Sequence, residues 1–351
     1  MTTIIDDSLL SPPASSRFDT DVFVRPKRRP TEPTKFGVVY NPRATANVGR
    51  APLRAIGTPC VAPTTHAELV DALRELAQRE VDTVVVSGGD GTVRDVLSAI
   101  PKAYAGMPEP SIAVLPAGRT DLIAGDIGAQ AREDELARLL AASRDRTLRT
   151  HLRPVFRIDD VIAPNGEVRT VRGMLFGALA FEVATRIGQG EIHATGASHG
   201  KAVTMTVVRT LENLFLRGDP DALRRGRPVS MNVDGRDDIA GADPMRSLLL
   251  VSGLRGDIVL DRSPFWGPAL PHELRYLDVH APTRGIVRAF GALLSRRPWL
   301  AGESWRSGAA STIDLGMDRP FVVDGEIFEP QAGRSVRLVS DGPTRFVAPA
   351  A

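Results

Sequence analysis

The spacing of apolar residues separates an unpatterned N-terminal segment from a regularly patterned chain. Residues 1–34 contain five prolines and show neither helical nor strand periodicity, which predicts a disordered tail. The apolar run 36–40 then predicts a buried strand. Thr65 and Glu68, three positions later, form a capping-box pattern, and apolar residues then recur at helical spacing over 69–77, which predicts a helix.

Two more strand patterns follow, and they alternate with helical ones. The β-branched run 81–86 and the apolar run 112–115 predict buried strands, and helices are expected over 92–100 and 133–144. Strands that alternate with helices are typical of a parallel α/β sheet. The sequence therefore predicts an α/β domain over residues 35–150.

The pattern changes near residue 150. Short strand-like runs such as 229–233 are separated from there on by Asn-Gly, Asp-Gly and other glycine-rich turns, which predicts a mainly β domain over residues 151–320. Residues 285–300 differ, because apolar side chains recur there at helical spacing beside arginines. Such a helix fits packing on the β domain or docking on a bilayer with Trp299 at the interface.

Composition and charge narrow the classes of function. The chain has 44 Lys and Arg against 42 Asp and Glu, and this net charge of +2 does not indicate a nucleic-acid partner. Cys60 is the only cysteine, which excludes an internal disulfide and a thiolate zinc site and favours a reducing compartment. No signal-peptide pattern and no run of 18 apolar residues occur, so we expect a cytoplasmic protein whose membrane contact is peripheral. The basic run 25–29 is one candidate for contact with anionic headgroups.

A glycine-rich loop carries the strongest chemical signal. The sequence Ser87-Gly88-Gly89-Asp90-Gly91-Thr92 lies between a predicted strand and a predicted helix. Glycines there let backbone N–H groups approach phosphate oxygens, and the positive end of the following helix favours their charge. An acidic side chain beside phosphate needs a divalent cation or oriented donors between them, so Asp90 is predicted to organise the nucleotide and Mg²⁺. A tight turn without a ligand is the alternative.

Two further loops are expected at the same edge of the sheet, because each follows a predicted strand. They comprise residues 41–45 and 116–121; in the second, Gly118 permits close approach and Asp121 is placed to cap the next helix. Ligands of open α/β sheets bind outside the carboxyl ends of the strands. We therefore expect the three loops to converge on one crevice.

These segments resemble the diacylglycerol kinase catalytic-domain superfamily, which also includes sphingosine and ceramide kinases and bacterial lipid kinases. The resemblance rests on Asn41-Pro42, on the glycine loop, on the stretch 115–128 and on Val323-Asp324-Gly325-Glu326. It implies a Rossmann-like α/β domain with a parallel sheet and a C-terminal β-sandwich domain. It further implies that the nucleotide lies in the cleft between them and that residues 321–351 return to the first domain.

The same resemblance implies an ATP-dependent kinase that phosphorylates a hydroxyl of a membrane lipid, with Mg²⁺ arriving on ATP. Asp324 and Glu326 would lie beside that hydroxyl, one of them as proton acceptor, a role for which a carboxylate suffices. Taken without the resemblance, the Asp-Gly-Glu sequence is a β-turn. The residues that would contact ATP are Asn41, Thr64, Gly88, Gly89, Asp90, Gly91, Thr92, Gly118, Arg119 and Thr120.

The chain departs from the family pattern inside the nucleotide site. Family members usually carry Thr at the position of Arg119, Asn at that of Asp121 and an Asn-Glu pair at Arg94-Asp95. The Arg119 guanidinium would bind phosphate through charge-assisted hydrogen bonds and offset the negative charge of Asp121. The segment that holds a structural metal in some relatives is also incomplete, since Asp278 alone keeps its later acidic position.

Other functions stay open at this point. An NAD kinase shares the Gly-Gly-Asp-Gly-Thr loop on a similar two-domain plan, although the downstream Asn-Glu pair typical of those enzymes has no convincing counterpart here. A catalytically inactive nucleotide or lipid sensor would keep the fold and lose turnover through changes such as Arg119 and Asp121. Among lipids, diacylglycerol leads by family frequency, with ceramide or a sphingoid base as the alternative. A homodimer is compatible with the sequence.

Overall fold

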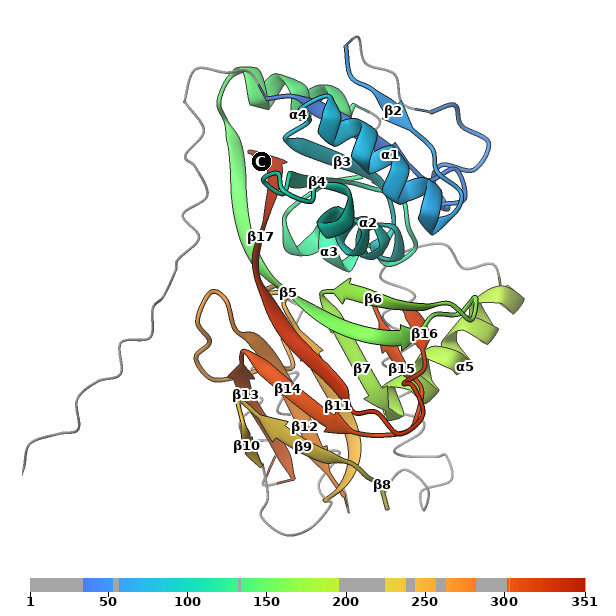
Figure 1. The fold of residues 1–351 in the computed structure, drawn as a ribbon, viewed down its shortest axis with the longest axis vertical. Coiled ribbons are helices and arrows are strands. Elements are labelled where there is room, and N and C mark those ends of the chain that lie inside the picture. Colours follow the sequence, from blue (N-terminus) through green and yellow to red (C-terminus); the bar gives the residue numbers. More distant parts are fainter. Residues whose placement is uncertain are drawn as a thin grey trace, which may run out of the picture. The chain divides into compact units, whose positions relative to one another are not determined.

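Uninterrupted apolar runs form the central strands of the N-terminal half. The computed structural model describes residues 34–52, 57–131, 134–195, 225–237, 244–256, 263–281, 302 and 304–350. Its first strands pair in parallel in the order β2-β1-β3-β4 and alternate with helices (Figure 1). These elements are β1 (Phe36–Tyr40), β2 (Cys60–Val61), α1 (His66–Gln78), β3 (Thr83–Gly88), α2 (Asp90–Ala103), β4 (Ser111–Pro116), α3 (Leu122–Asp126) and α4 (Glu135–Arg144).

The two faces of this parallel sheet have separate cores. Leu73 of α1 and Leu97 of α2 pack with Val84 and other side chains on one face of the sheet. Leu139 of α4 packs with Val85 on the other face. Helices on both faces of a parallel sheet define the α/β class that the sequence predicts.

Among the boundaries that differ from those predicted, two concern the glycine loop. β3 extends to Gly88 because its ladder with β4 continues to the pair of Gly88 and Pro116. α2 begins at Asp90, two residues before the predicted start, with Gly89 as its N-cap. The turn between strand and helix is therefore a single residue, and Gly91 belongs to the first helical turn.

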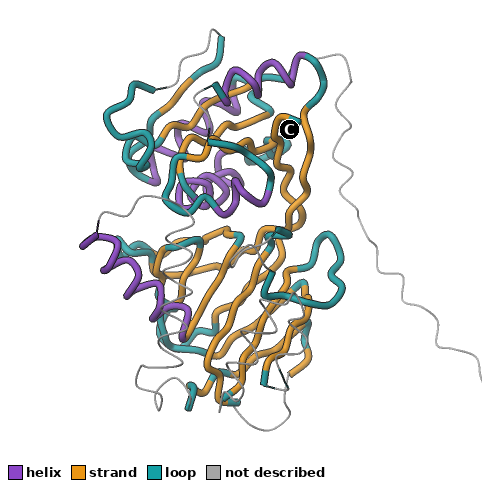
Figure 2. Tube along the Cα trace, turned by 180° about the vertical axis from the view of Figure 1, so that it is seen from behind, coloured by secondary structure: helices purple, strands orange, loops and turns teal. Residues whose placement is uncertain are grey.

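The C-terminal half is built from antiparallel strands. In the described parts of the chain, one group joins the first sheet and brings it to ten strands, and the other forms a separate sheet of seven strands. Helix α5 (Ala180–Thr195) is the helix that the structure describes among them (Figure 2). The strands are β5 (Leu148–Ile162), β6 (Val168–Gly173), β7 (Leu175–Leu179), β8 (Arg227–Pro228), β9 (Ser230–Val233), β10 (Arg236–Asp237), β11 (Met245–Ser252), β12 (Leu274–His280), β13 (Trp305–Ala310), β14 (Thr312–Gly316), β15 (Phe321–Val323), β16 (Glu326–Phe328) and β17 (Val336–Pro349).

Aromatic and branched side chains fill the space between these two sheets. Phe156 and Leu338 of the first sheet lie in one buried cluster with Phe176, Phe321 and Phe328 of the second. The ring centroids of Phe176 and Phe321 are 5.2 Å apart, and those of Phe321 and Phe328 are 6.3 Å apart. Two sheets packed face to face around such a core form a sandwich.

The last strand connects the two halves of the described chain. β17 pairs antiparallel with β5 along most of its length and reaches β4 through the pair of Phe346 and Ile112. β5 itself begins at Leu148 and runs through the position where the domain boundary is predicted. Residues Pro33–Ala351 cluster as one unit, and the division near residue 150 stays a prediction.

Several predicted features lie outside the described residues. They are the tail up to residue 33, its basic run 25–29 and the amphipathic stretch 285–300 with Trp299. Within the described parts, no helix is long and apolar enough to cross a membrane.

Candidate active site

Backbone hydrogen bonds draw the three predicted loops together at the carboxyl ends of β1, β3 and β4. Asn41 N donates to Ser87 O at 3.0 Å, which joins the first loop to the glycine loop. Ala117 N donates to Gly88 O at 3.1 Å, and Ala46 N donates to Ala117 O at 3.0 Å. The expected convergence is therefore confirmed for the three loops.

Two glycines let the second and third loops touch through their backbones. A Cβ placed on Gly118 would lie 2.6 Å from Gly89 Cα and 2.7 Å from Asp121 Oδ1. A Cβ placed on Gly89 would lie 2.9 Å from Gly118 Cα. Contacts this short do not occur for real Cβ atoms, so the approach of the two loops requires glycine at both positions.

The glycine loop leads into a helix that no side chain caps. Gly89 supplies no side-chain hydrogen bond to the first turn of α2, whereas Thr65 caps α1 by accepting from Glu68 N at 3.2 Å. The first N–H groups of a helix lack partners within the helix and bind anions readily. The start of α2 is therefore suited to a phosphate group.

Side chains from the first loop brace this turn. Asn41 Nδ2 donates to Thr92 Oγ1 at 2.8 Å, and Asn41 Oδ1 accepts from Arg43 N at 2.9 Å. Asn47, which the sequence reasoning did not single out, is buried and donates to Asn41 O, Ser87 O and Ser87 Oγ. Asn41 and Thr92 thus lie together as predicted, although each already has a protein partner.

Asp90 has a structural function that its place in a phosphate loop did not indicate. Its carboxylate accepts from Leu122 N at 3.0 Å and from Ile123 N at 2.9 Å, and so caps α3 from a different loop. Burial raises the pKa of Asp90, while these two amide bonds lower it. The role of Asp90 with Mg²⁺ stays a prediction, because the described geometry directs its oxygens to amides.

The expected capping of α3 by Asp121 is wrong. Asp121 is the N-cap residue in a left-handed conformation with φ of 49°, but its side chain makes no capping bond. Its Oδ1 atom instead accepts from Gly118 N at 3.0 Å. Burial and the nearby Asp90 carboxylate raise the pKa of Asp121 to about 6. The helix receives its cap from Asp90 because the converging loops bring that carboxylate to its first amides.

Replacing Asp90 with Ala is expected to lower the free energy of unfolding by about 1–3 kcal/mol, because two partly buried amides lose their acceptor. Urea unfolding of the nucleotide-free protein measures this effect. Asp71→Ala is the control, since Asp71 is 74% exposed and pairs only across the surface of α1 with Arg74. Equal stability of the Asp90 variant and the wild type would contradict the capping role.

The predicted acidic residues lie in the hairpin between β15 and β16, beside the glycine loop. Asp324 is 8% exposed, with φ of 45°, and its Oδ1 atom accepts from Leu175 N at 2.8 Å. Its Oδ2 atom accepts from Met174 N at 3.1 Å. The pKa of Asp324 is raised to about 7, chiefly by burial and also by the Asp90 carboxylate, against the opposing effect of Arg94 and of the two amides.

Glu326 reaches the glycine loop itself. A Cβ placed on Gly91 would lie 3.6 Å from Glu326 Oε1, and the Glu326 side chain is 47% exposed. Glu326 Oε2 accepts from Arg94 Nη2 at 2.6 Å. In the sequence Arg94 stands out only as a departure from the family pattern, whereas the structure makes it the link between α2 and the acidic hairpin.

The remaining predicted ATP contacts are less enclosed. Thr64 donates its hydroxyl to Glu68 Oε2 at 2.8 Å and so takes part in the cap of α1. Arg119 is exposed and makes no hydrogen bond or ion pair with the described residues, while Thr120 beside it is half-buried. The loop that carries them lies at one side of the crevice.

Asp278 does not belong to this site. It is 1% exposed and accepts from Arg246 Nε at 2.9 Å, and its other oxygen lies 2.6 Å from His280 Nε2. The Arg246 guanidinium thus supplies a positive charge beside this carboxylate. Among the described residues, no group of three or more His, Cys, Asp or Glu side chains could hold a metal ion.

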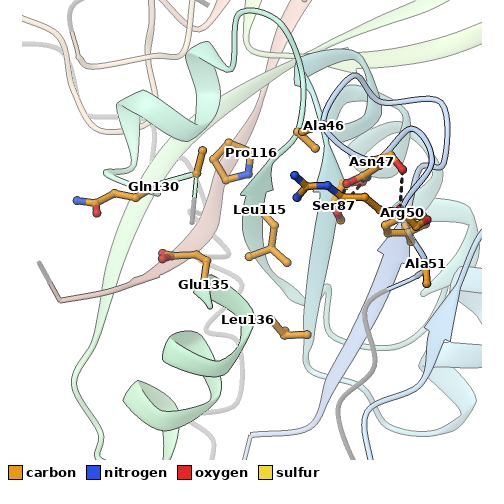
Figure 3. Close-up of a pocket in the computed structure, with 13 residues that line it drawn as sticks. Ala46, Asn47, Arg50, Ala51, Ser87, Leu115, Pro116, Gln130, Glu135 and Leu136 are labelled. Carbon is orange, nitrogen blue, oxygen red and sulfur yellow. Dashed lines mark hydrogen bonds between the residues drawn. The ribbon is translucent and has the colours of Figure 1, made fainter. Parts of the chain in front are cut away.

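A cavity of about 370 Å³ also opens at the ends of β1, β3 and β4 (Figure 3). Gln130 and Glu135 lie on one side of it and Asn47 and Arg50 on the other, with Leu115 between them. None of the predicted ATP contacts lines this cavity. The wall of this cavity includes Ser87. Successive residues of a strand face opposite sides of the sheet, so Ser87 and its neighbour Gly88 face opposite sides of β3. The cavity and α2 therefore lie on opposite faces of the strand.

Residues 35–151 match the family model described as "Diacylglycerol kinase catalytic domain". This segment contains the three converging loops. Residues 35–151 belong to the diacylglycerol kinase catalytic-domain family. No curated protein sequence matches the chain significantly.

Solved structures show the same fold beyond the limits of this kinase-family domain. A Bacillus anthracis protein assigned as a diacylglycerol kinase is similar with a TM-score of 0.57 at 17% identity, covering 91% of this chain and 98% of its own. A diacylglycerol kinase from the same organism gives a TM-score of 0.53 at 14% identity, with coverage of 91% and 98%. At this identity the likeness shows the fold, including the β strands that follow the kinase-family domain.

Proposed function

We propose that this protein is an ATP-dependent kinase that transfers a phosphoryl group to a hydroxyl of a membrane lipid. One observation carries the proposal: the Asp324–Glu326 hairpin lies against the glycine loop of a diacylglycerol kinase catalytic domain. Phosphoryl transfer needs a phosphate cradle and a proton acceptor for the attacking hydroxyl within one crevice. The uncapped start of α2 and the two carboxylates are groups of these kinds.

The residues at the start of α2 fit the phosphates of ATP. The helix begins directly after Gly89 without a side-chain cap. Thr92 N and Val93 N donate to Gly89 O, which leaves the N–H groups of Asp90 and Gly91 and the positive end of the helix for an anion. The described residues do not fit a metal site built by the protein alone, since both Asp90 oxygens accept from amides. The Mg²⁺ expected with ATP would be held by phosphate oxygens and would offset their charge.

Asp324 is the proposed proton acceptor. The lipid hydroxyl oxygen forms a bond to the γ-phosphorus, the bond from that phosphorus to the bridging oxygen breaks, and ADP leaves with the electron pair. The hydroxyl proton passes to the Asp324 carboxylate. A pKa of about 7 suits a general base at neutral pH, because about half of the carboxylate is then ionised and it accepts a proton readily.

The substrate class follows from the family rather than from a described pocket. Diacylglycerol is the first candidate and a ceramide or sphingoid base the second, and either would require peripheral contact with a membrane. The decisive assay measures transfer from labelled ATP with Mg²⁺ to these lipids in mixed micelles, with NAD as a soluble acceptor. Labelled lipid supports the proposal. Labelled NADP would favour an NAD kinase, and ATP binding without transfer to any acceptor would favour a sensor.

Replacing Arg119 with Ala is expected to weaken ATP binding by about tenfold, because an exposed guanidinium with no described partner is free to pair with phosphate. Lipid binding should change far less. Calorimetry with a non-hydrolysable ATP analogue and flotation with lipid vesicles measure the two separately. An unchanged nucleotide affinity would contradict the phosphate role of Arg119.

A further inference from the structure

Arg94 is a fully buried cation located one helical turn after the glycine loop. It is 0% exposed, and its guanidinium contacts three different elements. Nη2 donates to Glu326 Oε2 at 2.6 Å and to Asp95 Oδ1 at 3.0 Å, and Nη1 donates to Val323 O at 3.2 Å. The guanidinium also lies over the Phe328 ring, 5.2 Å from its centroid.

These contacts hold the acidic hairpin on both of its strands. Val323 ends β15, Glu326 begins β16, and Phe328 lies two residues further along β16. A planar guanidinium can bond a carbonyl and two carboxylates at once in fixed directions, which an ammonium group cannot do. Arg94 therefore fixes where the hairpin lies relative to α2, and with it the position of Asp324.

We propose that Arg94 is a positioning residue for phosphoryl transfer, which holds Glu326 at the glycine loop and keeps the Asp324 carboxylate ionised as proton acceptor. The proposal rests on the proposed kinase function. It assigns a task to a residue that differs from the Asn usual at this position in the family.

The charges around Asp324 support this assignment. From α2, Asp90 disfavours the ionised carboxylate and Arg94 favours it. The amides of Met174, just before β7, and of Leu175, its first residue, also favour it. Glu326 and Asp95 also surround Arg94 and keep the guanidinium charged, with Arg169 paired to Asp95 at 3.4 Å. Arg94 is thus the side chain that opposes the effect of burial on the pKa of Asp324.

The test compares Arg94→Met with Arg94→Lys. Methionine keeps much of the stem and removes the charge, so the acid limb of the pH profile for kcat/KM should move upward by about one pH unit or more. At pH 6 this shift lowers kcat/KM by about tenfold, because the ionised fraction falls tenfold per pH unit. Lysine should restore most of the acid limb but not the full kcat, since it cannot bond all three partners.

Arg246→Met is the matched control, because Arg246 is equally buried and ion-paired but lies with Asp278, outside the crevice. It should leave the acid limb in place. A shift of similar size in this control would overturn the proposal, because general destabilisation would then explain both variants.

A second readout does not depend on kinase activity. Carbon-13 NMR of the full-length protein follows titration of the Asp324 carboxyl, assigned by its absence in Asp324→Asn. The proposal is supported if the titration of Asp324 moves to higher pH in Arg94→Met and stays near that of the wild type in Arg94→Lys. This holds even if no lipid is phosphorylated and the proposed kinase function is wrong. An Asp324 titration that is unchanged in Arg94→Met overturns it. If the methionine variant does not fold, a shift of about one pH unit in the titration of Asp324 in Arg94→Lys would overturn the proposal instead.

Discussion

Replacing Asp324 with Asn is expected to lower kcat for lipid phosphorylation by about 100- to 10,000-fold, the usual contribution of a general base. An asparagine oxygen in the place of Oδ1 can still accept from the amides of Met174 and Leu175, as Oδ1 does at 3.3 and 2.8 Å, so the hairpin should keep its place. Steady-state kinetics at pH 8 measures the loss. Asp318→Asn, an exposed change outside the crevice, is the control and should retain the wild-type kcat.

The pH dependence of the wild type follows from the same carboxyl. Since the pKa of Asp324 is raised to about 7, kcat/KM should rise with pH through about 7 and level off above it. Folding favours the protonated form of this carboxyl relative to the unfolded chain, because the folded pKa is the higher one. Its contribution to stability is therefore full below the unfolded pKa of about 4 and is lost as pH rises through about 7.

This pH dependence of stability distinguishes loss of the general base from loss of the folded structure. Asn stays neutral at every pH, so Asp324→Asn should have a higher Tm than the wild type at pH 8, and the difference should shrink towards pH 4. Thermal unfolding at the two pH values tests this. A variant that is inactive and also less stable at pH 8 would contradict the role assigned to Asp324.

Replacing Gly118 with Ala is expected to raise the Kd for ATP at least about tenfold and to lower the free energy of unfolding by about 1–3 kcal/mol. The added Cβ would lie 2.6 Å from Gly89 Cα, and backbone cannot move aside as the end of a side chain can. The two loops must then separate, which displaces the amides at the start of α2 from the phosphates.

Gly125→Ala is the matched control for this substitution. Gly125 lies in α3, only seven residues further along, and a Cβ there would have no neighbour within 4 Å. Nucleotide binding should be unchanged, and stability should be unchanged or slightly higher because Ala favours a helix. Calorimetry and urea unfolding measure both quantities. Similar ATP affinities in the Gly118 variant and the wild type would show that the loop contact is not needed for the site.

The local pattern of apolar and turn residues was sufficient to predict the first half of the fold and the position of the site. Buried strands at 36–40 and 112–115 leave a signature in a few consecutive residues, and so does the helix behind Thr65. The carboxyl ends of parallel strands share one edge, so the convergence of the loops followed from the order of the elements. The start of α2 was placed two residues late because glycines read as a turn even where they occupy the first helical turn.

What the individual acidic and basic side chains do was decided by contacts between distant parts of the chain. Asp90 caps a helix 32 residues away, and Arg94 binds Glu326 across 232 residues. No periodicity or spacing links such pairs, because they meet only after the strands and the hairpin have packed. The sequence by itself determined the α/β plan, the glycine loop and the crevice. The tertiary structure alone decided that Asp90 faces inward and that buried Arg94 holds the hairpin, since burial makes every charge depend on the partner that the fold supplies.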